Sequence, residues 1–346
     1  MMHDCKMGAT PKDDRGLRRQ RGVTLVELMV ALAIGLLVTV AMLKVYVDAS
    51  GMYRFNEGLA RVQENGRFAL EFLRRDARVA GFWGCHGDAA LTNSISTTSD
   101  AYNKGFDPKE EEFGHITGTE GGGDNADSVT FRSAAGSGAL VTADMSGPDG
   151  TITVDNASAL APGNAALISD CENGDFFQVT DISGAALVHA AGAGANIHPY
   201  LESEIAYAAG ARVYEARETT FSIQNDPSSG VPTLYREVIG EDPQPLVEGI
   251  EDMQILYGED TDADADGDNG DGTTNRYVVF GVDDDFDPDR IVSVRISLLV
   301  RSINNNLTTE PSPYTFNGST VTPGTTDKYL RKVFSTTVTL RNKAIN

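Results

Sequence analysis

The sequence predicts an α+β protein in which one long N-terminal helix, membrane-spanning in its first half, packs on an antiparallel β-rich globular head. Two observations lead to this prediction. Apolar residues fill the stretch from Val23 to Val47 and then continue as a one-sided stripe as far as Ala80. Beyond residue 81, short runs of alternating apolar and polar residues are separated by turns rich in Gly, Pro, Asn and Asp. These patterns divide the chain into four regions. A basic N-terminal segment covers 1–22, the long helix covers 23–80, a variable Gly- and Ala-rich β lobe covers 81–205, and a C-terminal β-sheet region covers 206–346.

The composition excludes several classes of protein. The 346 residues include 28 Lys and Arg and 50 Asp and Glu, which gives a formal net charge of −22, and 40% of the residues are hydrophobic. A bulk disordered chain would hold fewer apolar residues, and a nucleic-acid binder needs a basic face that displaces counterions. Only one long apolar run is present, so a polytopic membrane protein is excluded as well.

The apolar run is predicted to cross a membrane once. A spanning helix needs about 20 mostly apolar residues, and Val23–Val47 supplies that length. Four arginines lie in Arg15–Arg21, and such a basic flank keeps the N-terminus cytoplasmic while the remainder is exported. The run does not end in the small-residue cleavage site of a secretory signal. Glu27 is an ionisable residue near the start of the run, and it marks either the headgroup boundary of a plain anchor or a functional site.

The predicted helix has one apolar face in its second half, formed at steps of three and four by Phe55, Leu59, Val62, Gly66, Ala69, Leu73, Ala77 and Ala80. Gly81 then provides a C-terminal stop. Because a helical Gly costs about 1 kcal/mol relative to Ala, we expect bends or melted turns at four positions, Gly35, Gly51, Gly58 and Gly66.

Ten segments of the remaining chain are predicted as strands. The clearest is Arg290–Arg301, in which alternate apolar residues from Val292 to Val300 share one face. The other nine are 127–132, 151–154, 165–169, 176–182, 212–223, 233–238, 252–257, 276–282 and 329–342.

The residues around Glu27 resemble the leader junction of type IV prepilins. Arg18-Arg-Gln-Arg-Gly22 precedes Val23-Thr-Leu-Val-Glu27 and an uninterrupted apolar helix. In that family a peptidase cuts after the Gly and methylates the new N-terminal amine. The resemblance implies that residues 1–22 are a leader peptide, that Gly22 is the cleavage residue, that Val23 is the methylated N-terminus, and that Glu27 is the assembly carboxylate. Val23 departs from the family pattern, in which Phe or Met is commoner.

The physical chemistry of Glu27 agrees with that role. Cleavage after Gly22 creates a positive amine on Val23, and the amine of a neighbouring subunit can pair with Glu27 in the low dielectric of a helix bundle. A carboxylate left unpaired there is costly. Entry into a filament is therefore expected to depend on Glu27.

Three segments of the C-terminal half look like the PilW minor pilins, which are similar to the J-type minor pseudopilin of type II secretion. These segments are Leu246–Tyr257, Arg290–Ser302 and Arg331–Asn342, and Arg78–Cys85 fits the same group. The resemblance implies a minor pilin that primes pilus assembly, sits near the tip, and supports twitching motility and adhesion. It also implies that the chain first spans the inner membrane once, with its N-terminus in the cytoplasm and its head in the periplasm, and that it later enters the extracellular pilus. The implied partners are other minor pilins, the major pilin, the prepilin peptidase, the assembly platform and a large tip adhesin.

The three cysteines suggest one disulfide. Cys5 would be lost with the leader, and Cys85 and Cys171 would remain in an exported head, where disulfides persist. Closing that loop would stabilise the head by roughly 4 kcal/mol in the chain-entropy model. The alternatives are two free thiols or a thiol–metal site.

The acidic segment 259–271 is a candidate calcium site. Asp262, Asp264, Asp266 and Asp268 alternate, with Gly267 at the sixth place, as in the first half of an EF-hand loop. The twelfth place is Thr273 rather than Glu, and Asp271 or a backbone carbonyl would have to replace that ligand. The alternative is a solvated hairpin tip without a metal.

No catalytic motif is present, since the chain lacks G-x-S-x-G, H-E-x-x-H, a phosphate loop and a dinucleotide fingerprint. We therefore predict no enzymatic activity and no required cofactor. Two other functions are compatible with these features, a minor pseudopilin of a type II secretion system and a membrane-tethered calcium-binding surface protein.

Overall fold

The structure is a computed structural model that describes residues 22–84, 90–110, 113–122, 125–192, 194–262, 270–282 and 286–343. The chain divides into two compact units, Met1–Arg54 and Phe55–Asn346, and each is described by itself. We refer to the second unit as the head. Helix α1, Leu25–Val79, contributes residues to both units.

In the first unit, α1 is mostly apolar, and its residues Leu28–Leu43 include no charged side chain. Its side chains are exposed, with Leu36 and Val45 each 67% accessible, and none of the most apolar window is buried. By length and composition this helix could cross a membrane. The helix is continuous from Leu25 to Val79, so the melted turns expected at its four glycines are absent, and the bends stay a prediction. An isolated helical Gly costs only about 1 kcal/mol, which the good helix formers around it offset.

In the head, α1 buries the predicted stripe. Val62, Gly66, Ala69, Leu73 and Ala77 are its buried residues, and the small side chains allow close packing. An added Cβ on Gly66 would lie 2.5 Å from the Phe334 ring, so glycine at this position makes room for an aromatic side chain.

The helix ends where Gly81 was predicted to stop it. Gly81 has a φ of +76° and its N–H donates to the Arg132 carbonyl at 2.9 Å. The Asn342 side chain donates to the carbonyls of Val79 at 3.3 Å and Ala80 at 3.1 Å. These contacts supply partners for groups that a helix end leaves unpaired.

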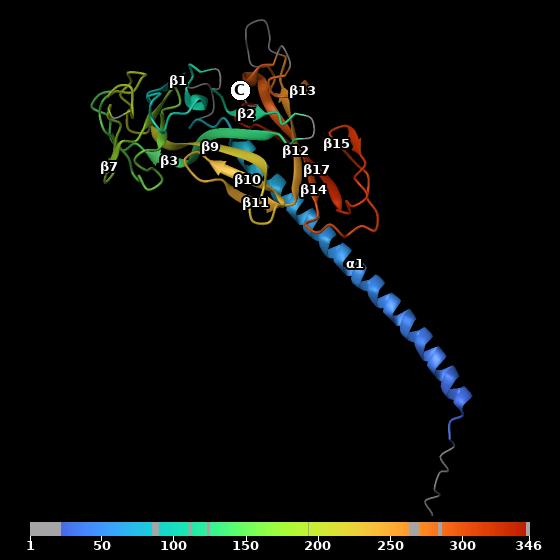
Figure 1. Cartoon of the computed structure of the whole chain (residues 1–346). Coiled ribbons are helices and arrows are strands. Elements are labelled where there is room, and N and C mark those ends of the chain that lie inside the picture. The colour runs from blue at the N-terminus through green and yellow to red at the C-terminus, as the bar shows by residue number, and fades with distance from the viewer. Residues whose placement is uncertain are drawn as a thin grey trace, which may run out of the picture. The chain divides into compact units, whose positions relative to one another are not determined.

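The larger sheet has eight strands. Its main path runs β1-β6-β5-β9-β10-β11, and β3 pairs with both β9 and β2. Figure 1 shows β3, β9, β10 and β11 side by side. All pairs are antiparallel except β1 with β6. The sheet takes strands from both sides of residue 205, so the two β regions are joined through it. Its strands are β1 Ala90–Asn93, β2 Ile116–Thr119, β3 Ser128–Leu140, β5 Ala165–Ser169, β6 Asn173–Gln178, β9 Arg212–Asn225, β10 Pro232–Val238 and β11 Gln244–Glu248.

A second sheet has the order β13-β12-β14-β17 and is antiparallel throughout. Its strands are β12 Ile250–Glu259, β13 Arg276–Val278, β14 Ile291–Arg301 and β17 Arg331–Thr339. Two small sheets and two 3-10 helices complete the described residues: β4 Ile152–Thr153, β7 Asp181–Ser183, β8 Ala186–Val188, β15 Tyr314–Phe316, β16 Ser319–Val321, η1 Lys104–Phe106 and η2 Pro288–Arg290.

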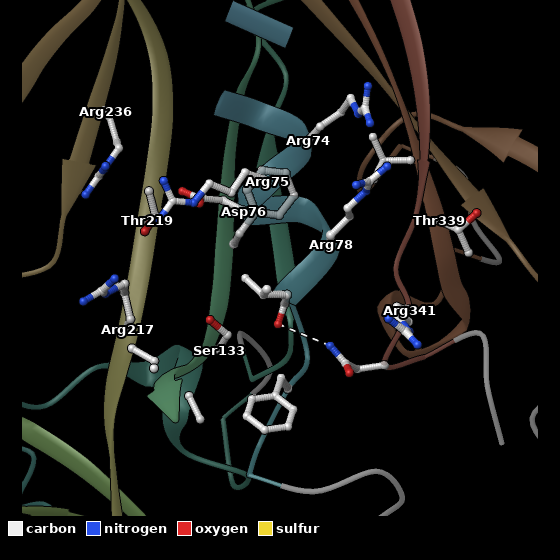
Figure 2. Close-up of a pocket in the computed structure, with 18 of the residues that line it drawn as sticks. Arg74, Arg75, Asp76, Arg78, Ser133, Arg217, Thr219, Arg236, Thr339 and Arg341 are labelled. Atoms are coloured by element: carbon white, nitrogen blue, oxygen red, sulfur yellow. Dashed lines mark hydrogen bonds between the residues drawn. The ribbon is translucent and has the colours of Figure 1, made fainter. Parts of the chain in front are cut away.

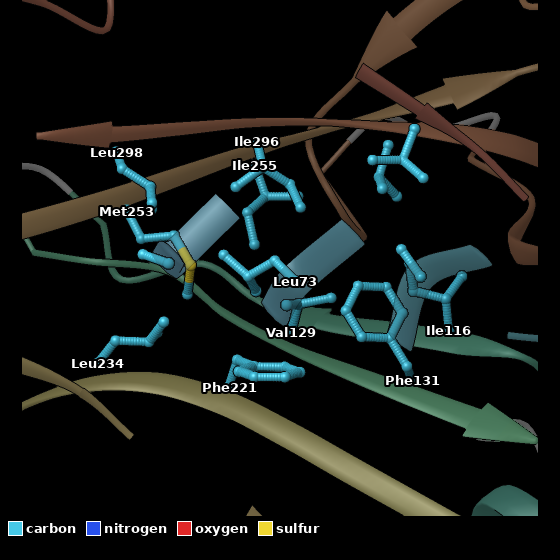
Figure 3. Close-up of a cluster of buried hydrophobic side chains, with 14 of the residues drawn as sticks. Leu73, Ile116, Val129, Phe131, Phe221, Leu234, Met253, Ile255, Ile296 and Leu298 are labelled. Carbon is cyan, nitrogen blue, oxygen red and sulfur yellow. The ribbon is translucent and has the colours of Figure 1, made fainter. Parts of the chain in front are cut away.

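The main core lies where α1 passes between the two larger sheets (Figure 3). Leu73 of α1 meets Phe221 of β9 on one side and Ile255 of β12 on the other. The alternating residues of β14, including Val294 and Ile296, are fully buried in this core, as their period of two predicts. Two further apolar clusters lie largely within residues 82–216.

One predicted strand is divided in the structure. The segment 176–182 was expected to be a single strand, but β6 ends at Gln178 and β7 begins at Asp181. Thr180 already bonds the carbonyl of Val188, because the chain leaves the large sheet at this point to pair with β8.

Replacing Gly66 with Ala should destabilise the head by about 1–3 kcal/mol, since the new methyl group must displace the Phe334 ring. The loss of unfolding free energy should be smaller in a Phe334→Ala background, where the clash is absent. Urea unfolding of the full chain in detergent measures the loss in each background. Gly51→Ala is the matched control, because nothing lies within 4 Å of its added Cβ. An equal loss in the two backgrounds would contradict this packing role.

Candidate functional site

The predicted cleavage junction lies immediately before α1. Gly22 and Val23 precede the helix, and Val23 is 73% exposed. The basic segment before them lies outside the described residues. The described part of the junction is therefore a short non-helical approach to a helix, with its side chains accessible.

Glu27 forms a capping box with Thr24. The Glu27 Oε2 atom accepts hydrogen bonds from the Thr24 backbone N–H and from its hydroxyl, both at 2.9 Å. In return the Glu27 N–H donates to Thr24 Oγ1 at 3.3 Å. This reciprocal arrangement satisfies groups that a helix start leaves unpaired. This capping box was not among the sequence predictions, although the pattern Thr-x-x-Glu before an apolar run predicts one.

Only one oxygen of Glu27 is used in this way. Among the described residues, Oε1 has no hydrogen-bond partner, and both contacts from Thr24 go to Oε2. The carboxylate can therefore start the helix through one oxygen and offer the other to a cation. Both Thr24 and Glu27 lie after Gly22, so cleavage there would keep the capping box.

The acidic segment brings three carboxylates together at the end of β12. Oxygen atoms of Asp260, Asp262 and Asp271 lie within 4.8 Å of one another. Asp262 and Asp271 were predicted ligands. Asp264, Asp266 and Asp268 lie outside the described residues. Asp260 was missed because the EF-hand register was counted from Asp262, although Asp260 continues the same spacing of two.

Hydrogen bonds hold these carboxylates in place. Asp260 is 2% exposed and accepts from the N–H groups of Asp262 at 3.1 Å and Gly272 at 2.7 Å. Asp271 accepts from the Thr273 N–H at 2.9 Å and from its hydroxyl, and these bonds lower the pKa of Asp271. Three carboxylates with further lone pairs form a hard oxygen set of the kind that Ca²⁺ prefers.

A buried ion pair supports the base of this segment. Glu259 has a fully buried side chain and bonds Arg276 at 2.6 Å and the Asp287 N–H at 2.9 Å. These contacts tie the end of β12 to β13 and to the start of η2. They fix the direction in which the chain enters the acidic segment.

Cys171 is disulfide-bonded. Cys5 and Cys85 lie outside the described residues, so the pairing of Cys85 with Cys171 stays a prediction. Cys171 has a φ of +81°, and it directly follows Asp170, two residues after the end of β5.

Comparisons with known families match both ends of the chain. Residues 17–43 match a family model described as "Prokaryotic N-terminal methylation motif", and residues 220–342 match one described as "Type IV Pilus-assembly protein W", PilW. The resemblance to PilW-type prepilins is confirmed. The PilW match begins within β9 and includes the whole four-stranded sheet, whereas the methylation match includes Gly22, Val23 and Glu27. Both descriptions are of pilus and processing segments rather than of an enzyme.

Two other comparisons add little. No curated protein matches the chain. Among solved structures, a type IV-like pilin from Thermus thermophilus aligns over 82% of this chain and 98% of its own, with 12% sequence identity and a TM-score of 0.34. A TM-score of that size supports no inference about this chain.

Replacing Arg276 with Ala should destabilise the head by roughly 2–3 kcal/mol, because the buried Glu259 carboxylate would lose its cationic partner. Arg276→Lys should recover part of the loss by restoring a positive charge. Thermal unfolding of the two variants beside the unmodified chain measures this. An Ala variant as stable as the unmodified chain would show that Glu259 needs no partner.

Proposed function

We propose that this chain is a minor pilin that primes assembly of a type IV pilus, sits at or near the pilus tip, and supports twitching motility and adhesion. One observation carries the proposal. A methylation-motif start, with Gly22, Val23 and Glu27 in order, stands on an apolar helix in the same chain as a PilW-type C-terminal region.

The chemistry of the helix start supports subunit docking. Once the leader is removed, the Val23 ammonium of one subunit can approach Glu27 of a neighbour. The Oε1 atom of Glu27 suits that contact, because Thr24 occupies only Oε2 and no other described residue bonds Oε1. Attraction between the two charges is strong in an apolar helix bundle, where few water molecules compete.

The size of the head favours a minor position over a repeated one. The head unit runs from Phe55 to Asn346, and its sheets carry many connecting loops. A bulky head restricts how closely identical subunits can stack, whereas a subunit at the tip has no neighbour above it. The proposed partners follow from this position: other minor pilins, the major pilin and a large tip adhesin.

The membrane stage of the proposal places α1 in the inner membrane before assembly. The basic flank keeps the N-terminus in the cytoplasm, where the prepilin peptidase cuts, and the head faces the periplasm. The inner-membrane assembly platform would then extract the helix into the growing filament.

Two substitutions separate the proposed pairing of Glu27 with a neighbouring subunit from its capping of α1. Glu27→Gln keeps a capping oxygen but removes the charge, so it should lower the amount of the chain in sheared filaments at least tenfold. Thr24→Val removes the cap but keeps the charge, and it should lower incorporation much less. Immunoblots of sheared filaments and membranes measure the partition. Normal incorporation of Glu27→Gln would contradict the pairing.

A deletion strain separates the pilus from the type II secretion alternative. Loss of surface pili and of twitching, with normal protein secretion, is the expected result. Loss of secretion with normal pili would reassign the chain to a pseudopilin.

We infer calcium binding at Asp260, Asp262 and Asp271 as a second property, on the ground that their oxygens converge. Calcium at about ten times its dissociation constant should stabilise the head by roughly 1.4 kcal/mol. This corresponds to a rise in Tm of about 2–4 °C. The bound ion would neutralise the mutual repulsion of the carboxylates.

The calcium test uses thermal unfolding with and without the ion. Asp262→Asn and Asp271→Asn should abolish the rise in Tm. Asp181→Asn, an exposed carboxylate on β7, is the control and should keep it. An unchanged Tm in the unmodified chain would leave the segment as a solvated tip.

A further inference from the structure

A basic cleft of about 1100 Å³ opens in the head beside the last turns of α1 (Figure 2). The helix forms its floor. Strands β3, β9 and β10 of the larger sheet lie along one side, and Thr336–Thr339 of β17 lie along the other. The cleft is therefore a gap between the two sheets that α1 holds apart.

Arginine dominates this cleft. Six arginines line it, against one acidic residue, Asp76. They come from four separate parts of the chain: Arg74, Arg75 and Arg78 from α1, Arg217 from β9, Arg236 from β10, and Arg341 after β17. In a protein with a net charge of −22, such a concentration of positive charge is a strong local departure from the rest of the surface.

Most of this charge has no ion-pair partner among the described residues of the head. Among the described residues, Arg74 pairs with Glu71 at 3.7 Å and Arg217 with Glu215 at 2.8 Å. No carboxylate of the described residues forms an ion pair with Arg75, Arg78, Arg236 or Arg341. Burial raises the pKa of Asp76, an effect that Arg236, Arg75 and Arg217 oppose. One half-buried carboxylate cannot neutralise this group.

The strand that borders the cleft is an open edge. Within the described part of the chain, β17 pairs only with β14. The Leu340 N–H donates to the Val292 carbonyl at 2.8 Å, so the backbone of Val338 is also directed at β14. Because successive residues of an antiparallel strand direct their backbone groups to opposite sides, Thr337 and Thr339 direct their N–H and C=O groups away from β14. Such an edge can accept another strand.

We propose that this cleft docks an extended acidic segment of a partner protein, which adds a strand to β17 and places its carboxylates against the arginines. The open edge selects a polypeptide, because a small anion would leave the backbone groups of β17 unused. The arginines select its charge, since guanidinium groups bind carboxylates with two parallel hydrogen bonds. This inference is independent of the proposed pilus function.

The test uses a fluorescein-labelled octapeptide of alternating Glu and Thr and the full-length chain in a neutral detergent. Fluorescence anisotropy should show saturable binding that weakens at high salt. Arg78→Gln and Arg341→Gln should each raise the dissociation constant about tenfold, as expected for a lost hydrogen bond to a charged group. Arg67→Gln is the matched control, since Arg67 is an exposed arginine of α1 outside the cleft.

Two competitors decide what the cleft recognises. The unlabelled peptide should displace the probe, whereas inorganic phosphate at the same ionic strength should not. A peptide methylated on alternate backbone nitrogens should bind at least tenfold more weakly, because it cannot pair with β17. Displacement by phosphate would make the cleft a small-anion site and overturn the proposal. Equal binding of the methylated peptide, an equal effect of Arg67→Gln, or no binding of the probe would overturn it as well.

Discussion

The structure depends on one helix that must satisfy two different surroundings. Residues 28–43 of α1 carry no charge and are exposed, whereas residues 55–79 bury a single stripe between two sheets. The small residues of that stripe, Gly66, Ala69 and Ala77, let both sheets approach the helix backbone. A substitution in that stripe would therefore disturb the packing of the main core, where strands from both larger sheets contact the helix.

The region matched by the PilW family model contains many of the strands that pack on α1. The PilW match at 220–342 includes the four-stranded sheet and the neighbouring β10 and β11, which cover the helix stripe. Much of the chain before it builds two apolar clusters of its own, one around Phe177 and one around Phe106 and Phe176. The family model thus covers much, but not all, of the part of the head that packs on α1. The unmatched part also contributes Ile116, Val129 and Phe131 to the core around the helix.

Patterns that are local in sequence predicted local structure well. The spacing of apolar residues predicted the buried stripe, Gly81 predicted its end, and the alternation in 290–301 predicted β14. Features that depend on distant partners were missed. Short strands such as β1 and β15 exist only because another segment pairs with them, and the reason for Gly66 is the ring of Phe334.

The candidate sites follow the same rule. Asp262 was predicted from the spacing of an EF-hand loop and Asp271 as a substitute for its missing last ligand, whereas the position of Asp260 beside them follows from the folded end of β12. The six arginines of the cleft are scattered over more than 260 residues of sequence, from Arg74 to Arg341, and no sequence pattern connects them. The Thr24–Glu27 capping box was visible in the sequence but was obscured by the stronger expectation of an intermolecular role for Glu27.

The central claim is that removal of the leader creates a positive amine on Val23, which pairs with Glu27 of a neighbouring subunit. Intact-mass and N-terminal fragment analysis of the chain extracted from membranes tests it most directly. The account predicts a polypeptide that begins with N-methylated Val23. A mature chain that still begins with Met1, or one that begins at Val23 even when the prepilin peptidase is deleted, would contradict it.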